Sequence, residues 1–246
     1  MLGQHLVNNK AGVIAIGSGY VLAGKRTYRV TIPGRGGQVS NPQDCIDPVV
    51  VACYVVVRLQ SIVNREIDPN ETAVITCGTV RAGDGPNVIP DSAELTIDIR
   101  AYSSEVLAKA VAAVKRIVKA ECQASGLEDE PDIREIEHVP PLVNIPEAVK
   151  CQEQQFKDSF GSRMVQCLKP NMASDDFSVL APKGVHYIYW TIGCIDPDVW
   201  DGYEREGRLD QLPANNSPLS APALELTLRA AIDAWSIGAL MLLAVV

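Results

Sequence analysis

Hydrophobic and polar residues recur at two different spacings along the chain. Alternation with a period of two indicates a strand, and recurrence every three or four residues indicates a helix. From residue 25 to residue 137 these patterns predict six elements in the order strand, helix, strand, strand, helix, strand. The predicted elements cover residues 27–32, 47–64, 72–80, 92–101, 103–125 and 131–139.

Both helices of this region also carry terminal signals. Pro48 lies in the first turn of one helix, Ser103 and Glu105 open the other, and Gly126 follows its end. The order β-α-β-β-α-β is the ferredoxin-like split motif, and the region has the size that this motif needs. We therefore expect an α+β fold with a ferredoxin-like domain at residues 25–137.

The sequence on either side of this domain has a different character. Residues 138–246 look α/β, with predicted helices near 146–160 and 221–242, strands at 163–168 and 186–193, and a long loop after the second strand. Residues 1–24 are too few to fold alone. The ferredoxin-like domain is thus expected to be inserted in a partial α/β domain, with residues 1–24 as a remnant of its first part and 138–246 as its second.

The last helix is apolar enough to raise the question of a membrane. Its final run, SIGALMLLAVV, is about half of the ~20 residues that span a bilayer. Glu225, Arg229 and Asp233 recur every four residues and mark one polar face, which favours an amphipathic core helix. No secretory signal pattern opens the chain, so we expect a cytoplasmic protein.

The net charge limits the classes of binding partner, and the cysteine content indicates the redox compartment. The chain carries 22 Lys and Arg against 30 Asp and Glu, a net charge of −8, and lacks a basic cluster, which argues against nucleic acid and anionic membrane. Its seven cysteines include no C-x-x-C pair, and several lie in apolar runs. They are typical of free thiols in a reducing compartment.

One loop looks built to hold particular side chains. PGRGGQVSNPQ, residues 33–43, follows a predicted strand with three glycines and places Gln38 and Gln43 five residues apart. Glutamine is a poor metal ligand and cannot transfer a proton at neutral pH. The loop therefore raises the question of which chemistry its two glutamines can support.

Several stretches, in this order, resemble one family. They are LGQHLVNNKAG, GRGGQVSNPQ, the run from Ile46 to Thr76, GPNVIPDSAEL, PPLVN, MASDDFS and DQLPANNSPLSAPA. The family is the metal-dependent aminoacylase/carboxypeptidase-type amidohydrolases (metallopeptidase family 20), including hippurate hydrolase and plant auxin-conjugate hydrolases. The resemblance implies a two-metal α/β catalytic domain with an inserted lid that mediates dimerisation. It also implies hydrolysis of an amide bond in N-acyl amino acids or related conjugates.

The glycine-rich loop departs from the family pattern. The family usually has histidines where this chain has Gln38 and Gln43, and the first of them reaches across a dimer to the scissile carbonyl. The resemblance thus makes Gln38 a candidate catalytic residue. A glutamine amide still donates one neutral hydrogen bond to an oxyanion, although it cannot become a cation.

The residues that the resemblance assigns to metal binding also depart from the family pattern. His5 matches a family metal ligand, and Asn216 stands where the family has a second metal-binding histidine. The other ligands, among them the glutamate that serves as general base, would precede residue 1. The resemblance implies zinc or manganese, and asparagine is a weak ligand for zinc. We therefore expect metal binding by this chain to be weak or absent.

The residues that the resemblance assigns to substrate binding agree better with the family pattern. Asn87 and Arg100 match lid positions that hold the polar end and the carboxylate of the substrate, and Arg suits bidentate carboxylate capture. Asp175 and Asp176 match an acidic pair, with Asp175 a candidate catalytic residue. Without the resemblance, Asn87 is a common turn residue, Arg100 a solvated strand end, and the two aspartates a helix N-terminus.

Three functions are compatible with this pattern. One is an amidohydrolase whose missing residues come from another chain or segment, acting on an acyl amino acid as a homodimer. Another is a non-catalytic descendant that dimerises or binds a ligand. The third is an enzyme that uses the old pocket for metal-independent chemistry. The residues at positions 38, 43 and 216 favour an impaired or altered hydrolase.

Overall fold

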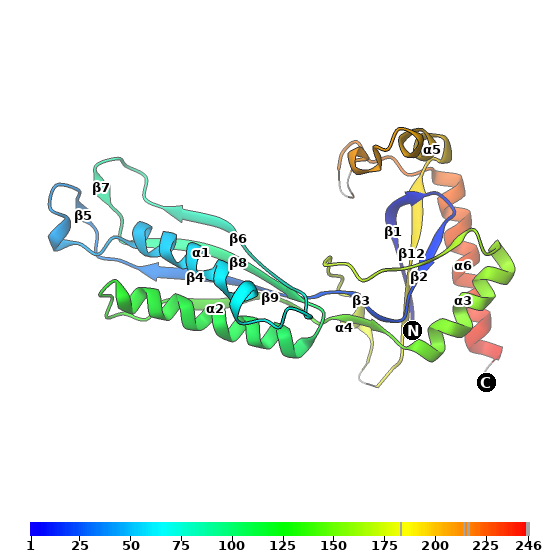
Figure 1. The fold of residues 1–246 in the computed structure, drawn as a ribbon, viewed down its shortest axis with the longest axis horizontal. Coiled ribbons are helices and arrows are strands. Elements are labelled where there is room, and N and C mark those ends of the chain that lie inside the picture. Colours follow the sequence, from blue (N-terminus) through cyan, green and yellow to red (C-terminus); the bar gives the residue numbers. More distant parts are fainter. Residues whose placement is uncertain (183, 214, 216, 245–246) are drawn as a thin grey trace. The chain divides into compact units, whose positions relative to one another are not determined.

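The computed structural model of the chain describes residues 1–182, 184–213, 215 and 217–244. These residues form two compact units (Figure 1). The terminal unit consists of Met1–Val21, Val143–Asn171 and the residues from Phe177 onwards, and the inserted unit consists of Leu22–Leu142 and Met172–Asp176. Both predicted boundaries, 25 and 137, fall inside the inserted unit, which also includes a short segment from much later in the chain.

The inserted unit has the predicted α+β architecture. Its elements are β4 (Gly24–Pro33), α1 (Pro48–Arg65), β6 (Ala73–Ala82), β8 (Ser92–Ala101), α2 (Ser104–Ala124) and β9 (Asp132–Val139). The four strands lie in the order β6-β8-β4-β9, and every neighbouring pair is antiparallel. This is the ferredoxin-like arrangement, so the predicted fold class is confirmed.

The core of this unit lies between the sheet and its two helices. Along β8 the apolar residues Leu95, Ile97 and Ile99 are fully buried, and the polar residues between them are half-buried on the opposite face. The buried residues pack against α1 and α2. Burial of one such side chain stabilises the fold by roughly 1.5–3 kcal/mol, so the alternation of β8 fixes which face of the sheet carries the helices.

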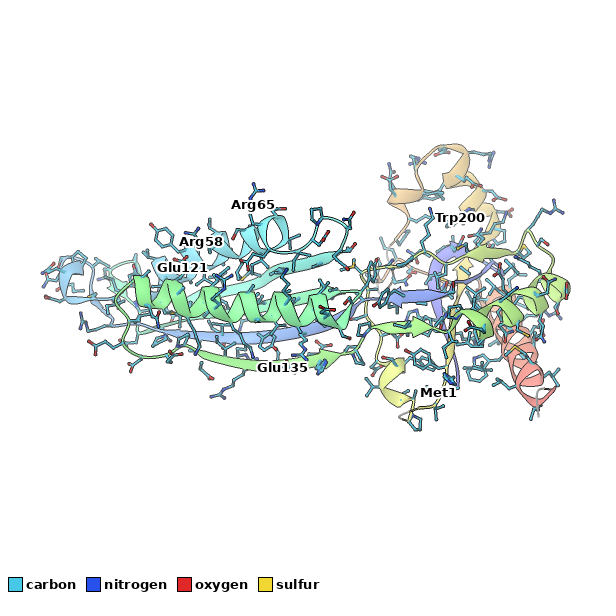
Figure 2. The ribbon with its side chains drawn as sticks, turned by 60° about the horizontal axis from the view of Figure 1, so that its bottom comes forward. Met1, Arg58, Arg65, Glu121, Glu135 and Trp200 are labelled. Carbon is cyan, nitrogen blue, oxygen red and sulfur yellow. The ribbon has the colours of Figure 1, made fainter. Side chains whose placement is uncertain are left out.

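Polar contacts hold the two helices at their ends and to each other. The Asp47 side chain caps α1 by accepting from the Val49 amide at 2.9 Å, and the Ser103 hydroxyl caps α2. Such caps contribute about 1 kcal/mol each. Arg58 of α1 donates from Nε to Glu121 of α2 at 3.1 Å, so the pair links the two helices (Figure 2).

The terminal unit has an α/β architecture. Its sheet has the order β1-β12-β2-β11, with α3 and α6 packed on one face. The elements are β1 (Leu2–Lys10), β2 (Ile14–Ile16), α3 (Pro146–Phe160), β11 (Val165–Cys167), α4 (Phe177–Leu180), β12 (Ile188–Ile195), α5 (Pro197–Arg205), η2 (Leu209–Gln211) and α6 (Leu224–Ala244). All eight residues of β12 are buried. Two further short strands, β3 (Gly19–Leu22) and β10 (Leu142–Asn144), pair with each other.

Residues 1–24, expected to be the first part of this domain, supply two strands of its sheet, β1 and β2. β1 runs parallel to β12 over most of its length, from Leu2 opposite Ile188 to Val7 opposite Gly193. Its sequence mixes Gln, His and Asn with few apolar residues, because much of the strand is only half-buried. The long loop expected after residue 193 also contains α5, which opens with an Asp196 cap.

Two helices, α1 and α6, are long and apolar enough to cross a membrane by length and composition alone. α1 places Val55, Leu59 and Ile62 in the core of the inserted unit. α6 places Ala230, Ala234 and Met241 in the core of the terminal unit, as expected for an amphipathic core helix. Each helix therefore has one face that belongs to a packed protein interior.

Candidate functional site

The glycine-rich loop is held tightly at one end of the inserted unit. The amides of Gly34 and Gly36 donate to the backbone and side chain of Asp91, at 2.8 and 3.0 Å. A Cβ atom at position 36 would lie 2.5 Å from the Ile89 carbonyl oxygen. The glycine at position 36 is therefore needed because the loop approaches the backbone of the neighbouring segment so closely.

This packing brings two of the predicted site residues together. Gln38 ends β5 (Gly37–Gln38), which pairs with β7 (Val88–Ile89), and Gln38 lies opposite Val88. The Val39 amide donates to the Asn87 carbonyl at 3.4 Å. Gln38 and Asn87 are both exposed, although 49 positions apart in the sequence. We refer to the ribbon formed by β5 and β7, together with Asn87 directly before β7, as the tip.

Gln43 lies in a different element from Gln38. It lies in the short 3-10 helix η1 (Pro42–Asp44), and its Nε2 donates to the Asp44 side chain at 3.4 Å. Asp44 in turn accepts from Arg35 Nε through its backbone carbonyl at 2.9 Å. Gln43 therefore contacts its own neighbour in the loop, and like Gln38 it is exposed.

Arg100 is built into a charged cluster on the polar face of the sheet. Its Nε donates to Asp98 at 2.7 Å, and its Nη1 donates to the Met172 carbonyl at 2.8 Å. Lys25, opposite Arg100 on β4, reaches Glu137 at 2.6 Å and Asp98 at 3.8 Å. Arg100 thus uses its Nε and Nη1 for contacts within the protein. Among the described residues no acceptor is given for Nη2, so this nitrogen can bind a ligand.

The predicted acidic pair lies in the segment Met172–Asp176, which joins the inserted unit beside this cluster. The Ala173 carbonyl accepts from the Ala23 amide at 2.9 Å, next to the start of β4. Asp175 is half-buried and Asp176 exposed, and α4 begins at the following residue. The structure therefore places the segment of Asp175 close to Arg100 and also agrees with the simpler interpretation of a helix N-terminus.

Within one chain, the tip and the Arg100 cluster lie at opposite ends of the inserted unit. Lys25, near the start of β4, pairs with Arg100, and the tip loop follows Pro33 at the end of β4. At ~3.3 Å per residue, this stretch of strand spans roughly 25–30 Å. A small substrate cannot contact both groups on the same chain.

His5 lies on the terminal unit, half-way along β1. Its side chain is exposed, and its Nδ1 lies 2.6 Å from the Leu6 carbonyl oxygen. A neutral imidazole that donates from Nδ1 keeps its Nε2 lone pair available for a ligand. Asn215 also donates to the Leu6 carbonyl, at 3.2 Å, so Asn215 lies beside the strand of His5. Asn216 itself lies outside the described residues.

The donor set does not fit a two-metal centre. Among the described residues no group of three or more His, Cys, Asp or Glu side chains could hold a metal ion. A catalytic zinc site normally takes three protein ligands, and His5 supplies one. The residues present therefore do not account for a complete metal site.

Sequence reasoning missed the residues that hold the candidates in place. Asp98 accepts from Arg100 and lies 3.8 Å from Lys25, and Asp91 fixes the glycine loop. Asp98 and Arg100 could have been paired from the alternation of β8, since positions two apart lie on the same face of a strand. The contact between Asp91 and the loop joins distant segments and has no local sequence signal.

Comparison with a family model identifies the inserted unit. Residues 20–125 match the model of the peptidase dimerisation domain. The match covers β4, α1, β6, β8 and α2, which are the elements that bear the tip and Arg100.

Curated relatives cover more of the chain. It is 34% identical over 160 residues to hippurate hydrolase of Campylobacter jejuni, covering 65% of this chain and 41% of that protein. It is 36% identical over 179 residues to an IAA-amino acid hydrolase of Arabidopsis thaliana, covering 69% and 39%. It is 30% identical over 181 residues to N-acetyldiaminopimelate deacetylase of Streptococcus sanguinis, covering 74% and 48%. The chain thus spans less than half the length of each.

Solved structures share the fold across both units. A protein from methicillin-resistant Staphylococcus aureus, described as an aminohydrolase, matches with a TM-score of 0.75 at 24% identity, covering 96% of this chain and 57% of that one. A Bacillus subtilis dinuclear metal-binding peptidase of the M20 family matches with a TM-score of 0.59 at 18% identity, covering 86% and 56%. Together with the dimerisation domain and the amidohydrolase relatives, these matches show that the chain belongs to the M20 family of peptidases and amidohydrolases.

Proposed function

We propose that this chain provides the substrate-anchoring and dimerising part of a hydrolase that cleaves amide bonds in N-acyl amino acids. The observation that carries the proposal is the placement of Gln38 and Asn87 together on the tip and of Arg100 at the other end of the same unit. Hippurate, N-acetyldiaminopimelate and IAA-amino acid conjugates, named by the relatives, share an amide bond on an amino acid.

The distance between the two groups supports a site shared by two copies. Since β4 holds the tip and Arg100 roughly 25–30 Å apart, one substrate can meet both only if the tip of one copy reaches the Arg100 cluster of another. A peptidase dimerisation domain supports such a pairing. In this arrangement Arg100 binds the carboxylate of the amino acid, and the Gln38 and Asn87 amides of the partner subunit face its acyl group.

The chemistry available to these residues is binding and transition-state stabilisation. The Gln38 amide donates a neutral hydrogen bond to the oxygen of the scissile carbonyl, where negative charge develops during attack. Loss of one such donor typically costs ~10²–10³ in rate. Because the described residues offer only His5 as a metal ligand of the family type, no hydrolytic step is assigned to this chain alone.

Binding and hydrolysis can be measured separately. N-acetyl and N-benzoyl amino acids are titrated into the purified chain by calorimetry, and the same compounds are tested for amine release. We expect Arg100→Ala to weaken binding by about tenfold, from the loss of one charge-assisted anchor.

The outcomes distinguish the candidate functions. Hydrolysis that falls in Gln38→Ala supports the amidohydrolase. Binding without hydrolysis supports the ligand-binding descendant, which Gln38 and Asn216 in place of histidine favour. If none of the acyl amino acids binds, or if Arg100→Ala leaves the affinity unchanged, the proposal is wrong. A cytoplasmic location stays a proposal and is tested by fractionation.

A further inference from the structure

The pairing of β1 with β12 is irregular near the end of β1. Val7 lies opposite Gly193, and Lys10 lies opposite Ile195. Three steps along β1 thus match two steps along β12, so β1 carries one extra residue. Such a β-bulge redirects side chains and is frequent beside functional sites. A Cβ atom at position 193 would lie 2.0 Å from the Lys10 carbonyl oxygen, so the glycine of β12 leaves the space that the bulge needs.

The bulge brings three consecutive side chains to one cavity. In a regular strand, neighbouring side chains point to opposite faces. Asn8, Asn9 and Lys10 nevertheless all line a cavity of about 470 Å³. Its other walls include Arg163, shortly before β11, and Trp200 of α5 (Figure 2). Every residue that lines this cavity belongs to the terminal unit.

Two polar contacts fix the β1 side of the cavity. Lys10 donates from Nζ to both carboxylate oxygens of Asp201 at 2.7 Å, so these two charges neutralise each other. Asn8 donates from its amide nitrogen to the Pro213 carbonyl. The Asn8 Oδ1 is buried and has no hydrogen-bond partner among the described residues. An unpaired buried acceptor is costly, so a ligand that brings a donor to it would be stabilised.

Two further charged side chains line the cavity. Arg163 and Glu204 are both exposed, and neither forms an ion pair within the part of the chain that the structure describes. Met164 and Trp200, which are half-buried, add apolar surface to the same walls. The cavity therefore combines one unpaired positive charge, one unpaired negative charge and an apolar surface.

We propose that this cavity binds a free α-amino acid with a large apolar side chain. The carboxylate pairs with the Arg163 guanidinium. The ammonium group has three donors, so it pairs with Glu204 and also satisfies the Asn8 Oδ1. The apolar side chain packs against Trp200 and Met164. The cavity belongs to the terminal unit, whereas Arg100 belongs to the inserted unit, and this inference does not rest on the proposed function.

Other small ligands fit these charges less well. A phosphate or a simple carboxylate would meet Asp201 and Glu204 as like charges. An organic cation would meet Lys10 and Arg163 in the same way. Among the described residues no group of three potential metal ligands occurs, which does not favour a divalent metal ion. A zwitterion, by contrast, places one charge on each of the two unpaired side chains.

The test is calorimetric titration of the full chain with L-phenylalanine at about pH 7, where the amino acid is a zwitterion. We expect one site with a dissociation constant below about 1 mM. Arg163→Ala and Glu204→Ala should each weaken binding at least tenfold, because each removes one charged contact. Arg229→Ala and Glu225→Ala are the matched controls, since both residues are exposed on α6 and outside the cavity. Circular dichroism verifies that all four variants are folded.

Two analogues test the charge pattern of the ligand. 3-Phenylpropionate lacks the ammonium group and 2-phenylethylamine lacks the carboxylate, so each should bind at least tenfold more weakly than L-phenylalanine. Glu204→Ala should leave the affinity for 3-phenylpropionate unchanged or higher, because that compound has no group for Glu204 to bind. Arg163→Ala should likewise not weaken the binding of 2-phenylethylamine.

Several results would overturn the inference. One is the absence of L-phenylalanine binding to the folded chain. Another is an equal effect of Arg163→Ala and Arg229→Ala, or an affinity for 3-phenylpropionate equal to that for L-phenylalanine. Binding that Arg100→Ala abolishes and Arg163→Ala leaves unchanged would assign the amino acid to the inserted unit, which supports the proposed function and contradicts this site. Binding that depends on Arg163 and Glu204 supports the cavity even if no acyl amino acid binds through Arg100.

Discussion

Arg100 donates from its Nε to a carboxylate oxygen of Asp98 at 2.7 Å, two residues earlier on the same face of β8. The same guanidinium holds the Met172 carbonyl at 2.8 Å. The residue that resemblance assigns to substrate binding is therefore also a structural contact of the inserted unit. A substrate carboxylate would have to use the remaining guanidinium nitrogen or compete with Asp98.

Substitution of Asp98 separates these two roles. In Asp98→Asn the side chain at position 98 loses its charge, so its interaction with Arg100 weakens. Arg100 should then bind an acyl amino acid more tightly, by about two- to tenfold. The free energy of unfolding falls by about 1–2 kcal/mol, because a charge-assisted hydrogen bond is lost. Calorimetry and urea unfolding measure the two effects. A loss of both affinity and stability would mean that Asp98 orients Arg100 for binding.

The tip loop provides a test of local packing. Gly36→Ala should destabilise the inserted unit by about 1–3 kcal/mol, because the new Cβ would lie 2.5 Å from the Ile89 carbonyl oxygen. Gly85→Ala is the matched control, since the nearest atom to its Cβ, on Asn87, is 3.8 Å away. Thermal unfolding of both variants checks the prediction. Equal stabilities would show that the loop does not approach β7 as closely as described.

Cys122 should make the protein less stable in alkaline solution. Burial, followed by the nearby charges of Glu130 and Glu121, raises the pKa of its thiol to about 11 from 9.0. The folded state therefore keeps the thiol proton where the unfolded state loses it, and the free energy of unfolding falls as pH rises from 9 to 11, by roughly 2 kcal/mol. Urea unfolding across this range should show a shallower fall in Cys122→Ala.

Thiol labelling gives an independent check of the same region. Cys122 and Cys194 are buried, whereas Cys151 and Cys167 are exposed. At pH 8 the exposed group should react rapidly with a thiol reagent, and the buried pair should react only on unfolding. Rapid labelling of Cys122 in folded protein would contradict the predicted shift.

Dimerisation should depend on the outer face of α1. Val50, Tyr54 and Val57 are 48%, 60% and 71% exposed and lie on the side of α1 away from the sheet. Val57→Asp should weaken self-association at least tenfold, as measured by sedimentation velocity, because it places a charge in an apolar contact. Gln123→Glu, an exposed position on α2, adds the same charge and should have no effect. Protection of Cys53 from labelling in the dimer would confirm the location.

Zinc binding should be weak in the chain as it stands. His5 is exposed and lies in no cluster of three potential ligands among the described residues. Calorimetric titration with zinc should therefore give no stoichiometric site with a dissociation constant below about 1 μM. A tight site that disappears in His5→Ala would contradict this expectation and would indicate ligands supplied by another copy.

The inserted unit was predictable because its signals are local. The alternation around Leu95 and Ile97, the Asp47 and Ser103 caps, and the order of elements together define the ferredoxin-like arrangement. The same signals could not show that Gln38 and Asn87 share the tip, since that contact depends on pairing between segments far apart in the sequence.

The terminal unit was less predictable for a physical reason. β1 alternates imperfectly because its edge is open, and residues such as Gln4 and His5 carry no strand signal of their own. Its existence follows from pairing with β12, which is buried along its whole length. Position 216 was identified by resemblance alone and stays a prediction.

The parallel pairing of β1 with β12 has a consequence for the order of folding during synthesis. Leu2 pairs with Ile188, so β1 must wait until β12, far later in the sequence, has been synthesised before the hydrogen bonds between them can form. The segment Leu22–Leu142 is continuous and contains the whole sheet of the inserted unit, so it can fold while translation proceeds. During that interval β1 lacks the strand with which it pairs, so the terminal unit completes its sheet after the inserted unit can fold.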